Sequence, residues 1–214
     1  NSIFPKIHKE GYKFLAISII VTFFCLLVSK TLGIILILIS IWVYYFFRDP
    51  ERISVGEDKF LVSPADGLIS NISETKGPIE LGLENKSFTK VSIFMNVFNC
   101  HVNRIPTSGI VEEILYKPGK FLNASLDKAS EENERNYYKI KCKDNNQEIL
   151  IVQIAGLIAR RIVCETTEGQ SLNQGDRIGM IRFGSRVDVY FNNRKLLAKL
   201  GQNVVAGESL IAVE

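Results

Sequence analysis

The chain has 214 residues, with 26 basic and 23 acidic side chains and a formal net charge of +3. A charge this small and this dispersed does not favour a nucleic-acid partner. Only two histidines are present, and the four cysteines show no C-x-x-C spacing. Zinc sites of the His/Cys type and an H-E-x-x-H motif are therefore effectively excluded, and no metal is expected.

Two apolar runs occupy the N-terminal quarter, at residues 14–28 and 32–47, and only Ser29, Lys30 and Thr31 separate them. Each run is shorter than the roughly 20 residues that a straight helix needs to cross a bilayer core. We therefore expect a hairpin of two short helices, with a buried core hairpin of a soluble protein as the alternative. No small-residue cleavage site follows the first run, which argues against a signal peptide.

Basic residues flank both ends of this hydrophobic segment, at Lys6, Lys9, Lys13, Arg48 and Arg52. Because positive flanks tend to stay in the cytoplasm, the pattern predicts an anchor in the cell membrane with the remaining chain on the cytoplasmic side. Pro50 ends the second helix at or before Asp49. We expect residues 1–52 to form the anchor and residues 53–214 a β-rich domain.

The rest of the chain carries strand signals. Short β-branched and aromatic segments alternate with turn residues, at 60–62, 68–72, 91–94, 109–115, 137–142, 149–154, 177–181 and 187–191. Three further segments, 63–69, 169–179 and 201–212, resemble the glycine-containing hairpins of lipoyl-like folds. The predicted fold is mainly β: a barrel-sandwich (lipoyl-like) domain preceded by an N-terminal hydrophobic α-helical membrane hairpin. Residues 127–135 are highly charged and are expected to form a solvated loop.

A Gly-Ser pair, Gly184-Ser185, interrupts an apolar-alternating run near the C-terminus. Glycine has no Cβ, so the hydroxyl of the following serine can reach the glycine carbonyl and convert the amide into an ester. Elimination of that ester would leave Ser185 as a pyruvoyl group. The alternative is that Gly184 marks only a bend or bulge in the strand.

Two further residues are candidates for acid-base chemistry. His101 belongs to a polar cluster that also contains Asn99, Asn103 and Arg104. Burying this cluster without a ligand would leave many hydrogen-bond donors without acceptors, which favours a functional role for His101. The alternative is that His101 is a structural residue. Asp66 lies in a Ser-Pro-Ala-Asp-Gly turn, where it could bond its own backbone or orient a histidine. Asp66, His101 and Ser185 could form an acid-base-nucleophile set if the fold brings them together.

Six segments spread along the chain carry a more specific signal: Arg48-Asp49-Pro50, Ser63-Pro64-Ala65-Asp66-Gly67, residues 94–106, residues 119–124, residues 128–136 and Arg182-Phe183-Gly184-Ser185. Together they resemble the short bacterial form of the phosphatidylserine decarboxylase family. The resemblance covers essentially the whole chain, including the hydrophobic hairpin.

This resemblance implies a proenzyme that cleaves itself between Gly184 and Ser185. The products would be a β chain of residues 1–184 and an α chain of residues 185–214, which remain together as a heterodimer. Ser185 would become an N-terminal pyruvoyl group, the covalent cofactor, which forms a Schiff base with the amine of phosphatidylserine in the membrane. Loss of CO₂ and reprotonation would then yield phosphatidylethanolamine.

The resemblance also implies roles for single residues. His101 is the candidate acid that protonates the substrate-derived carbanion, and Asp66 the carboxylate that supports self-cleavage. Long-form relatives carry a His-x-x-His pair, whereas here Arg104 stands at the second position and stays protonated. The activator of Ser185 is therefore open between His101 with Asp66, and strain at Gly184 with water. We expect Arg104, Arg182 and Asn103 to bind the substrate; Arg186 could do the same or lie on a solvated surface.

Other functions are considered as alternatives. A decarboxylase of a related serine phospholipid would share every feature above. An anchored lipoyl-like adaptor of an export system would share the hydrophobic segment and the turns, but it usually carries heptads, which this chain lacks. The lipoyl-like tripeptide Asp127-Lys128-Ala129 has an unsuitable polar context. An Asp-His-Ser hydrolase would need a Gly-x-Ser-x-Gly elbow, which the sequence does not contain.

Overall fold

The computed structural model describes residues 4–122, 132–157, 161–182 and 184–214. The chain divides into two compact units, Asn1–Glu51 and Arg52–Glu214. Most of the charged loop expected at 127–135, and the whole lipoyl-like tripeptide at 127–129, lie outside the described residues.

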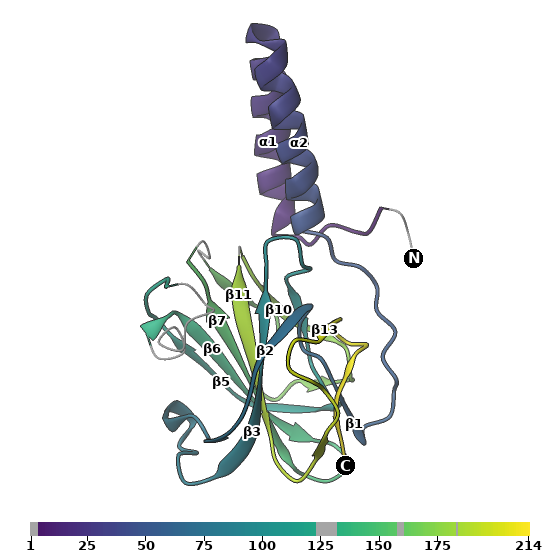
Figure 1. Cartoon of the computed structure of the whole chain (residues 1–214), viewed down its shortest axis with the longest axis vertical. Coiled ribbons are helices and arrows are strands. Elements are labelled where there is room, and N and C mark those ends of the chain that lie inside the picture. Colours follow the sequence, from purple (N-terminus) through teal and green to yellow (C-terminus); the bar gives the residue numbers. More distant parts are fainter. Residues whose placement is uncertain (1–3, 123–131, 158–160, 183) are drawn as a thin grey trace. The chain divides into compact units, whose positions relative to one another are not determined.

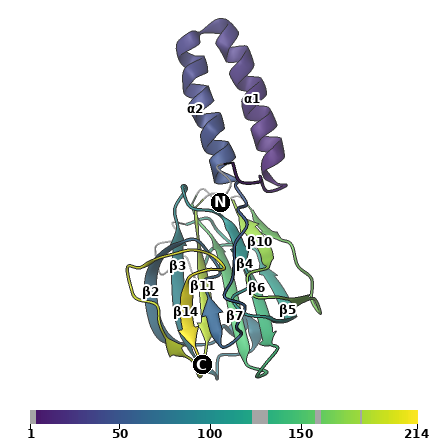
Figure 2. The same ribbon diagram turned by 90° about the vertical axis from the view of Figure 1, so that its right-hand side faces the viewer.

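The first unit contains two helices, α1 (Gly11–Val28) and α2 (Lys30–Phe46), joined at Ser29 (Figures 1 and 2). Ser29 is extended, which stops α1, and its side chain accepts a hydrogen bond from the Leu32 amide and so caps α2. Gly33 packs so closely against Leu26 that a Cβ atom would clash. The expected apolar helix pair is confirmed, and α2 ends before Pro50 as predicted.

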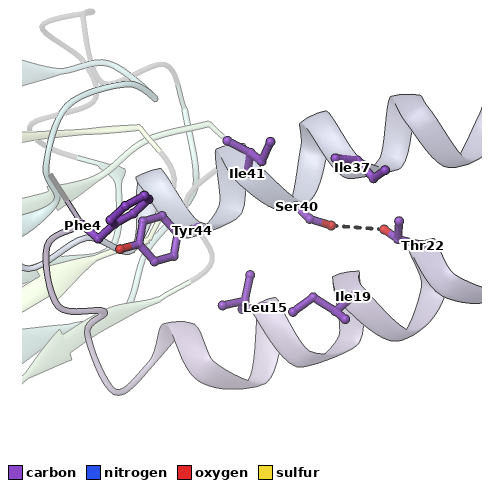
Figure 3. A pocket seen from close by; sticks show the side chains of 8 residues that line it. All are labelled: Phe4, Leu15, Ile19, Thr22, Ile37, Ser40, Ile41 and Tyr44. Atoms are coloured by element: carbon purple, nitrogen blue, oxygen red, sulfur yellow. Dashed lines mark hydrogen bonds between the residues drawn. The ribbon is translucent and has the colours of Figure 1, made fainter.

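Apolar side chains cover all faces of these helices, and α1 is long and apolar enough to cross a membrane by length and composition. A groove of about 610 Å³ between the helices is lined by Leu15, Ile19 and Ile37, among others (Figure 3). Two hydroxyl groups, Thr22 Oγ1 and Ser40 Oγ, lie 3.1 Å apart across it. The groove contains none of the residues that the sequence singles out for chemistry.

The second unit is built from antiparallel strands. The large sheet has the order β13 (Asn203–Val204), β2 (Gly67–Lys76), β3 (Ser87–Met95), β11 (Ser185–Phe191), β7 (Glu148–Ala155), β6 (Arg135–Cys142), β5 (Gly109–Lys117) and β9 (Ser171–Leu172). Two smaller sheets have the orders β1 (Phe60–Val62), β14 (Leu210–Val213), β12 (Lys195–Leu196), and β4 (Val102–Arg104), β10 (Arg177–Ile181), β8 (Ile162–Cys164). A 3₁₀ turn, η1 (Ile79–Leu81), follows β2.

The eight expected strands all form, and the mainly β barrel-sandwich prediction is confirmed. The large sheet curls around a core to which β11 contributes Val187, Val189 and Phe191 (Figure 1). Alternate residues of a strand share a face, so Ser185 also points toward this core. The glycines of the second and third lipoyl-like segments, Gly169, Gly175, Gly201 and Gly207, have positive φ, as their predicted turns require.

Ser185 lies at one edge of the large sheet, where β11 begins and its two neighbours, β3 and β7, end. Ser185 lies opposite Met95, the last residue of β3, and opposite Ala155, the last residue of β7. Since β11 runs antiparallel to both neighbours, the loops after β3 and β7 and the segment before β11 meet at this edge. The fold thus sets Ser185 between two loops at the entry to a central strand.

The expectation of a solvated loop at 127–135 is wrong for the residues of that segment that the structure describes. Asn133, Glu134 and Arg135 were expected in a solvated loop, but all three are buried. The side-chain amide of Asn133 donates to the backbone carbonyls of Leu122 and Ala155, at 2.8 and 2.6 Å. Glu134 Oε1 accepts from the Ile162 backbone N–H at 3.1 Å, and Arg135 pairs with the Glu80 carboxylate at 3.4 Å. Asn133 and Glu134 thus satisfy backbone groups near Ser185, which a charge pattern alone does not reveal.

Candidate functional site

Gly184 and Ser185 adopt conformations that set them apart from an ordinary strand. Gly184 has a φ of +63°, in the left-handed region, and among the described residues, its chain neighbours aside, no heavy atom lies within 4 Å of the position a Cβ would take. Ser185 follows as the first residue of β11 and is fully buried. Gly184 therefore does mark a bend, and this half-buried bend directly precedes a fully buried serine.

His101 contacts this bend directly. Its ring is buried, and its Nδ1 lies 3.0 Å from the carbonyl oxygen of Asn99. A carbonyl only accepts, so Nδ1 carries the proton in neutral His101. The other nitrogen, Nε2, accepts a hydrogen bond from the Gly184 backbone N–H at 3.3 Å. The histidine is thus held as one tautomer against the residue before Ser185.

The Ser185 hydroxyl rests on a sulfur atom. Ser185 Oγ donates to Met95 Sδ at 3.6 Å, and the side-chain amide of Asn103 donates to the same sulfur at 3.7 Å. A thioether is a weak acceptor, so this contact orients the hydroxyl without drawing its proton away. The predicted polar residue Asn103 is therefore next to the candidate nucleophile, although it is fully buried.

Two residues that the sequence analysis missed hold Asn103 in place. The side-chain amide of Gln153 donates to Asn103 Oδ1 at 2.8 Å, and the Tyr138 hydroxyl donates to Gln153 Oε1 at 2.9 Å. Burial raises the pKa of Tyr138 well above its ordinary value, so this hydroxyl remains a donor at physiological pH. The signal that could have identified Gln153 is its place as a polar residue between four apolar residues, 149–152, and the pair Ile154-Ala155 of β7.

Asp66 makes its described hydrogen bonds elsewhere. One carboxylate oxygen accepts from the Ala206 backbone N–H at 2.8 Å, and the other accepts from Arg52 Nη2 at 2.9 Å. Asp66 directly precedes β2, and β3 lies between β2 and the strand of Ser185. These contacts tie the Asp66 turn to the segment before β14.

The arginines expected to bind substrate differ in their surroundings. Arg104 is buried and donates from Nη1 to the carbonyl of Gly175 at 2.7 Å. Arg182 is partly exposed and lies two residues before Gly184. Arg186 is not solvated, which corrects that alternative: it is buried and pairs with Asp188 at 2.9 Å. Arg186 and Asp188 lie one and three residues after Ser185 in β11. Since successive side chains of a strand point to opposite faces, both face away from the core that Ser185 faces.

The fold and the site together define a class of protein: a mainly β enzyme with N-terminal apolar helices and a serine-centred site at a Gly-Ser peptide. Comparison with known families identifies it further. The phosphatidylserine decarboxylase family model matches residues 39–212. The chain therefore belongs to the phosphatidylserine decarboxylase family, which confirms the resemblance and replaces the adaptor and hydrolase alternatives.

Individual relatives agree over the full length. The chain is 67% identical over 212 residues to a phosphatidylserine decarboxylase proenzyme of Pelagibacter ubique (strain HTCC1062), covering 99% of this chain and 98% of the relative. Proenzymes of the same name from Ruegeria pomeroyi and Cereibacter sphaeroides are 49% and 51% identical. Each match covers 99% of this chain, and 97% and 91% of the respective relative.

Proposed function

We propose that this chain is a proenzyme that cleaves itself between Gly184 and Ser185 and then decarboxylates phosphatidylserine to phosphatidylethanolamine and CO₂. The observation that carries the proposal is the geometry of this one peptide unit. The Ser185 hydroxyl is buried beside a left-handed glycine, and His101 holds the amide of that glycine.

Self-cleavage would take place in three steps. Ser185 Oγ attacks the Gly184 carbonyl carbon, the C–N bond breaks as the C–O bond forms, and the hydroxyl proton ends on the Ser185 nitrogen. Loss of the Ser185 α-proton then breaks the ester C–O bond, releasing Gly184 as a carboxylate and leaving an unsaturated residue at the new N-terminus. Addition of water and departure of ammonia convert that residue into a pyruvoyl group.

The residues present fit such a group. Ser185 begins a strand, so cleavage in front of it removes no pairing from β11, which keeps β3 on one side and β7 on the other. The α chain of residues 185–214 would thereby stay bound to the β chain of residues 1–184 as a heterodimer. The pyruvoyl group supplies a ketone that takes up the substrate amine and accepts the electrons released with CO₂.

His101 is the residue we assign to proton transfer. In the uncleaved chain its Nε2 lone pair is occupied by the Gly184 N–H. Cleavage makes Gly184 a chain end, and where this end moves away, Nε2 can take up a proton from water and pass it to the substrate carbon. Asp66 supports this site indirectly: its carboxylate accepts hydrogen bonds from Arg52 and from the Ala206 backbone N–H, and these bonds fix the turn before β2.

Arg182 is the candidate for the substrate headgroup. Its guanidinium is a permanent cation, and its place just before Gly184 and its partial exposure suit a carboxylate or phosphate. Arg104 and Asn103 were expected to share this role. Their described contacts, to Gly175 and to Gln153 and Met95, support an indirect contribution by shaping the site.

The lipid nature of the substrate agrees with two further features. The helix pair of the first unit supports an anchor in the cell membrane, with residues 53–214 as the catalytic domain; its basic flanks favour the cytoplasmic side. In the second unit, exposed Phe98 and Leu157 follow β3 and β7, the strands next to β11. Apolar loop tips beside the site suit contact with a lipid surface.

The proposal is tested with the full chain in detergent micelles containing phosphatidylserine. We expect the wild type to release CO₂, and cyanoborohydride with substrate to attach the lipid amine to the fragment of residues 185–214. Ser185→Ala should remain uncleaved, folded and inactive. Ser92→Ala, which removes a buried serine of β3, is the control and should behave as wild type. Full decarboxylation by the uncleaved Ser185→Ala variant would overturn the proposal, and a preference for another serine phospholipid would redirect it.

A further inference from the structure

Five fully buried side chains are linked by successive hydrogen bonds into one network that ends at the Ser185 hydroxyl. They come from five strands: Tyr138 (β6), Gln153 (β7), Asn103 (β4), Met95 (β3) and Ser185 (β11). The contacts run from the Tyr138 hydroxyl to Gln153 at 2.9 Å, from Gln153 to Asn103 at 2.8 Å, and from Asn103 to the Met95 sulfur at 3.7 Å. Ser185 donates to the same sulfur at 3.6 Å.

The core would not need these groups for stability. Replacing a buried hydrogen-bonded pair with apolar groups of the same shape is often neutral, whereas an incomplete buried network costs stability. This network is nevertheless built in the middle of the apolar core that contains Ile93, Ile151 and Val187. At its other end, the single proton of the Tyr138 hydroxyl is shared between Gln153 Oε1 and the Ile178 carbonyl oxygen, which lies 3.1 Å away.

We propose that Met95 and Asn103, held by Gln153, are positioning residues for self-cleavage: they fix the Ser185 hydroxyl in the rotamer from which it attacks Gly184. The proposal rests on the function proposed above. Met95 is the cross-strand partner of Ser185 on the core face, so its sulfur is placed by the sheet register. Asn103 fixes the sulfur from the opposite sheet, and Gln153 fixes Asn103. The sulfur leaves the hydroxyl proton in place until a base accepts it.

The first test compares the two methionines of the chain. Met95→Leu and Met180→Leu make the same change at two fully buried positions, and of the two sulfurs it is that of Met95 that accepts the described hydrogen bond from Ser185. The full chain is synthesised in detergent, and the appearance of the two fragments is followed in time. We expect Met95→Leu to be cleaved about three- to tenfold more slowly than wild type, the factor for one modest hydrogen bond. Met180→Leu should match the wild type.

The second test uses pH to separate positioning from packing. In Gln153→Glu the protonated carboxyl group can still donate to Asn103 and accept from Tyr138, whereas the ionised form has no donor for Asn103 Oδ1. The cleavage rate of this variant, divided by the wild-type rate at the same pH, should therefore be near one at low pH. It should fall as the pH rises through the pKa of the introduced group, which burial places above the ordinary glutamate value.

Three results would overturn the proposal. The first is a Met95→Leu rate equal to that of Met180→Leu. The second is a Gln153→Glu ratio that does not change between about pH 5 and pH 9, as a packing defect alone would give. The third is normal cleavage of Met95→Leu with a raised KM for phosphatidylserine, which would assign the network to the substrate instead. If wild type itself stays uncleaved, the proposed function fails rather than this inference. The methionine comparison stands even if Gln153→Glu does not fold.

Discussion

His101 and Gly184 are joined by a hydrogen bond of 3.3 Å from the Gly184 backbone N–H to His101 Nε2, across 83 positions of sequence. This contact places the histidine on the residue whose carbonyl is the proposed target of Ser185. Under the proposed function, the same nitrogen accepts from the backbone before cleavage and transfers a proton to the substrate afterwards. The contact connects the two stages of the proposed reaction through one atom.

Replacing His101 should affect both stages. His101→Ala removes the acceptor for Gly184 and the proton donor, so we expect slower cleavage and, in the cleaved fraction, turnover reduced about a hundredfold or more. His101→Gln keeps an acceptor for the Gly184 amide and should recover part of the cleavage but not the turnover. Fragment yield and CO₂ release measure the two stages separately. Normal turnover in fully cleaved His101→Ala would remove His101 from the reaction.

The left-handed backbone at Gly184 should matter more than the space around it. The Cβ of Gly184→Ala has open space with respect to the described residues beyond its chain neighbours, but the φ of +63° disfavours any side chain by about 1–2 kcal/mol. We expect cleavage to slow about tenfold, because the variant leaves the conformation that presents the carbonyl. Gly201→Ala is a matched control with a φ of +79° and equally open space. It should lose similar stability and cleave normally; equal cleavage defects in both variants would contradict this account.

The apolar loop tips at the Ser185 edge should help only with membrane-bound substrate. Phe98 and Leu157 are 62% and 67% exposed. The double variant Phe98→Ser with Leu157→Ser should lower activity on phosphatidylserine vesicles about fivefold or more, because apolar contact with lipid is lost. Activity on a soluble short-chain phosphatidylserine should not change. Ile79→Ser serves as the control. Ile79 is similarly exposed, but it lies in η1, which follows the end of β2 that is far from Ser185. An equal loss on both substrates would argue against lipid contact.

Acid should weaken the second unit through Glu148. Burial alone would raise the pKa of Glu148, but hydrogen bonds and charge from Lys86 and Lys139 outweigh it, so its pKa lies below the ordinary 4.5. A group whose folded pKa is lowered stabilises the fold above its unfolded pKa, and this contribution disappears as the pH falls through the folded pKa.

The measurement is the urea midpoint of Glu148→Gln and wild type as a function of pH. We expect the variant to be less stable by less than about 1 kcal/mol at neutral pH, since such pairs remain partly hydrated. The difference should vanish below the folded pKa. Glu84→Gln, which removes an exposed carboxylate, is the control. A difference that persists unchanged in strong acid would show that the effect does not come from the ionised carboxylate.

Much of the fold could be predicted from sequence because its longer strands are rich in β-branched and apolar residues. In β3 these residues alternate with polar ones around Val91 and Ile93, whereas β7 carries an uninterrupted apolar run at 149–152. By contrast, β4 was missed because Val102-Asn103-Arg104 is short and mostly polar. Arg186 looked compatible with a surface because its partner Asp188 is recognisable only once β11 is known to be central.

The site could be predicted only in part. Gly184, Ser185 and His101 have distinctive chemistry, and the structure brings them together. Met95 has no such signal, and Gln153 has only its place as a polar residue in an apolar strand. The roles of both depend on which residues face each other across strands far apart in the chain. Asp66 shows the converse: its chemistry was recognised, but its described partners, Arg52 and Ala206, follow from loop packing.

The most direct test of the central claim is the intact mass of the purified wild-type protein. We predict two polypeptides, one ending at Gly184 and one beginning at residue 185. The smaller should be lighter than its encoded mass by one ammonia and should resist Edman sequencing, because a pyruvoyl group has no free amine. A single intact chain with full decarboxylase activity, or a small chain that begins with an unmodified serine, would contradict the account.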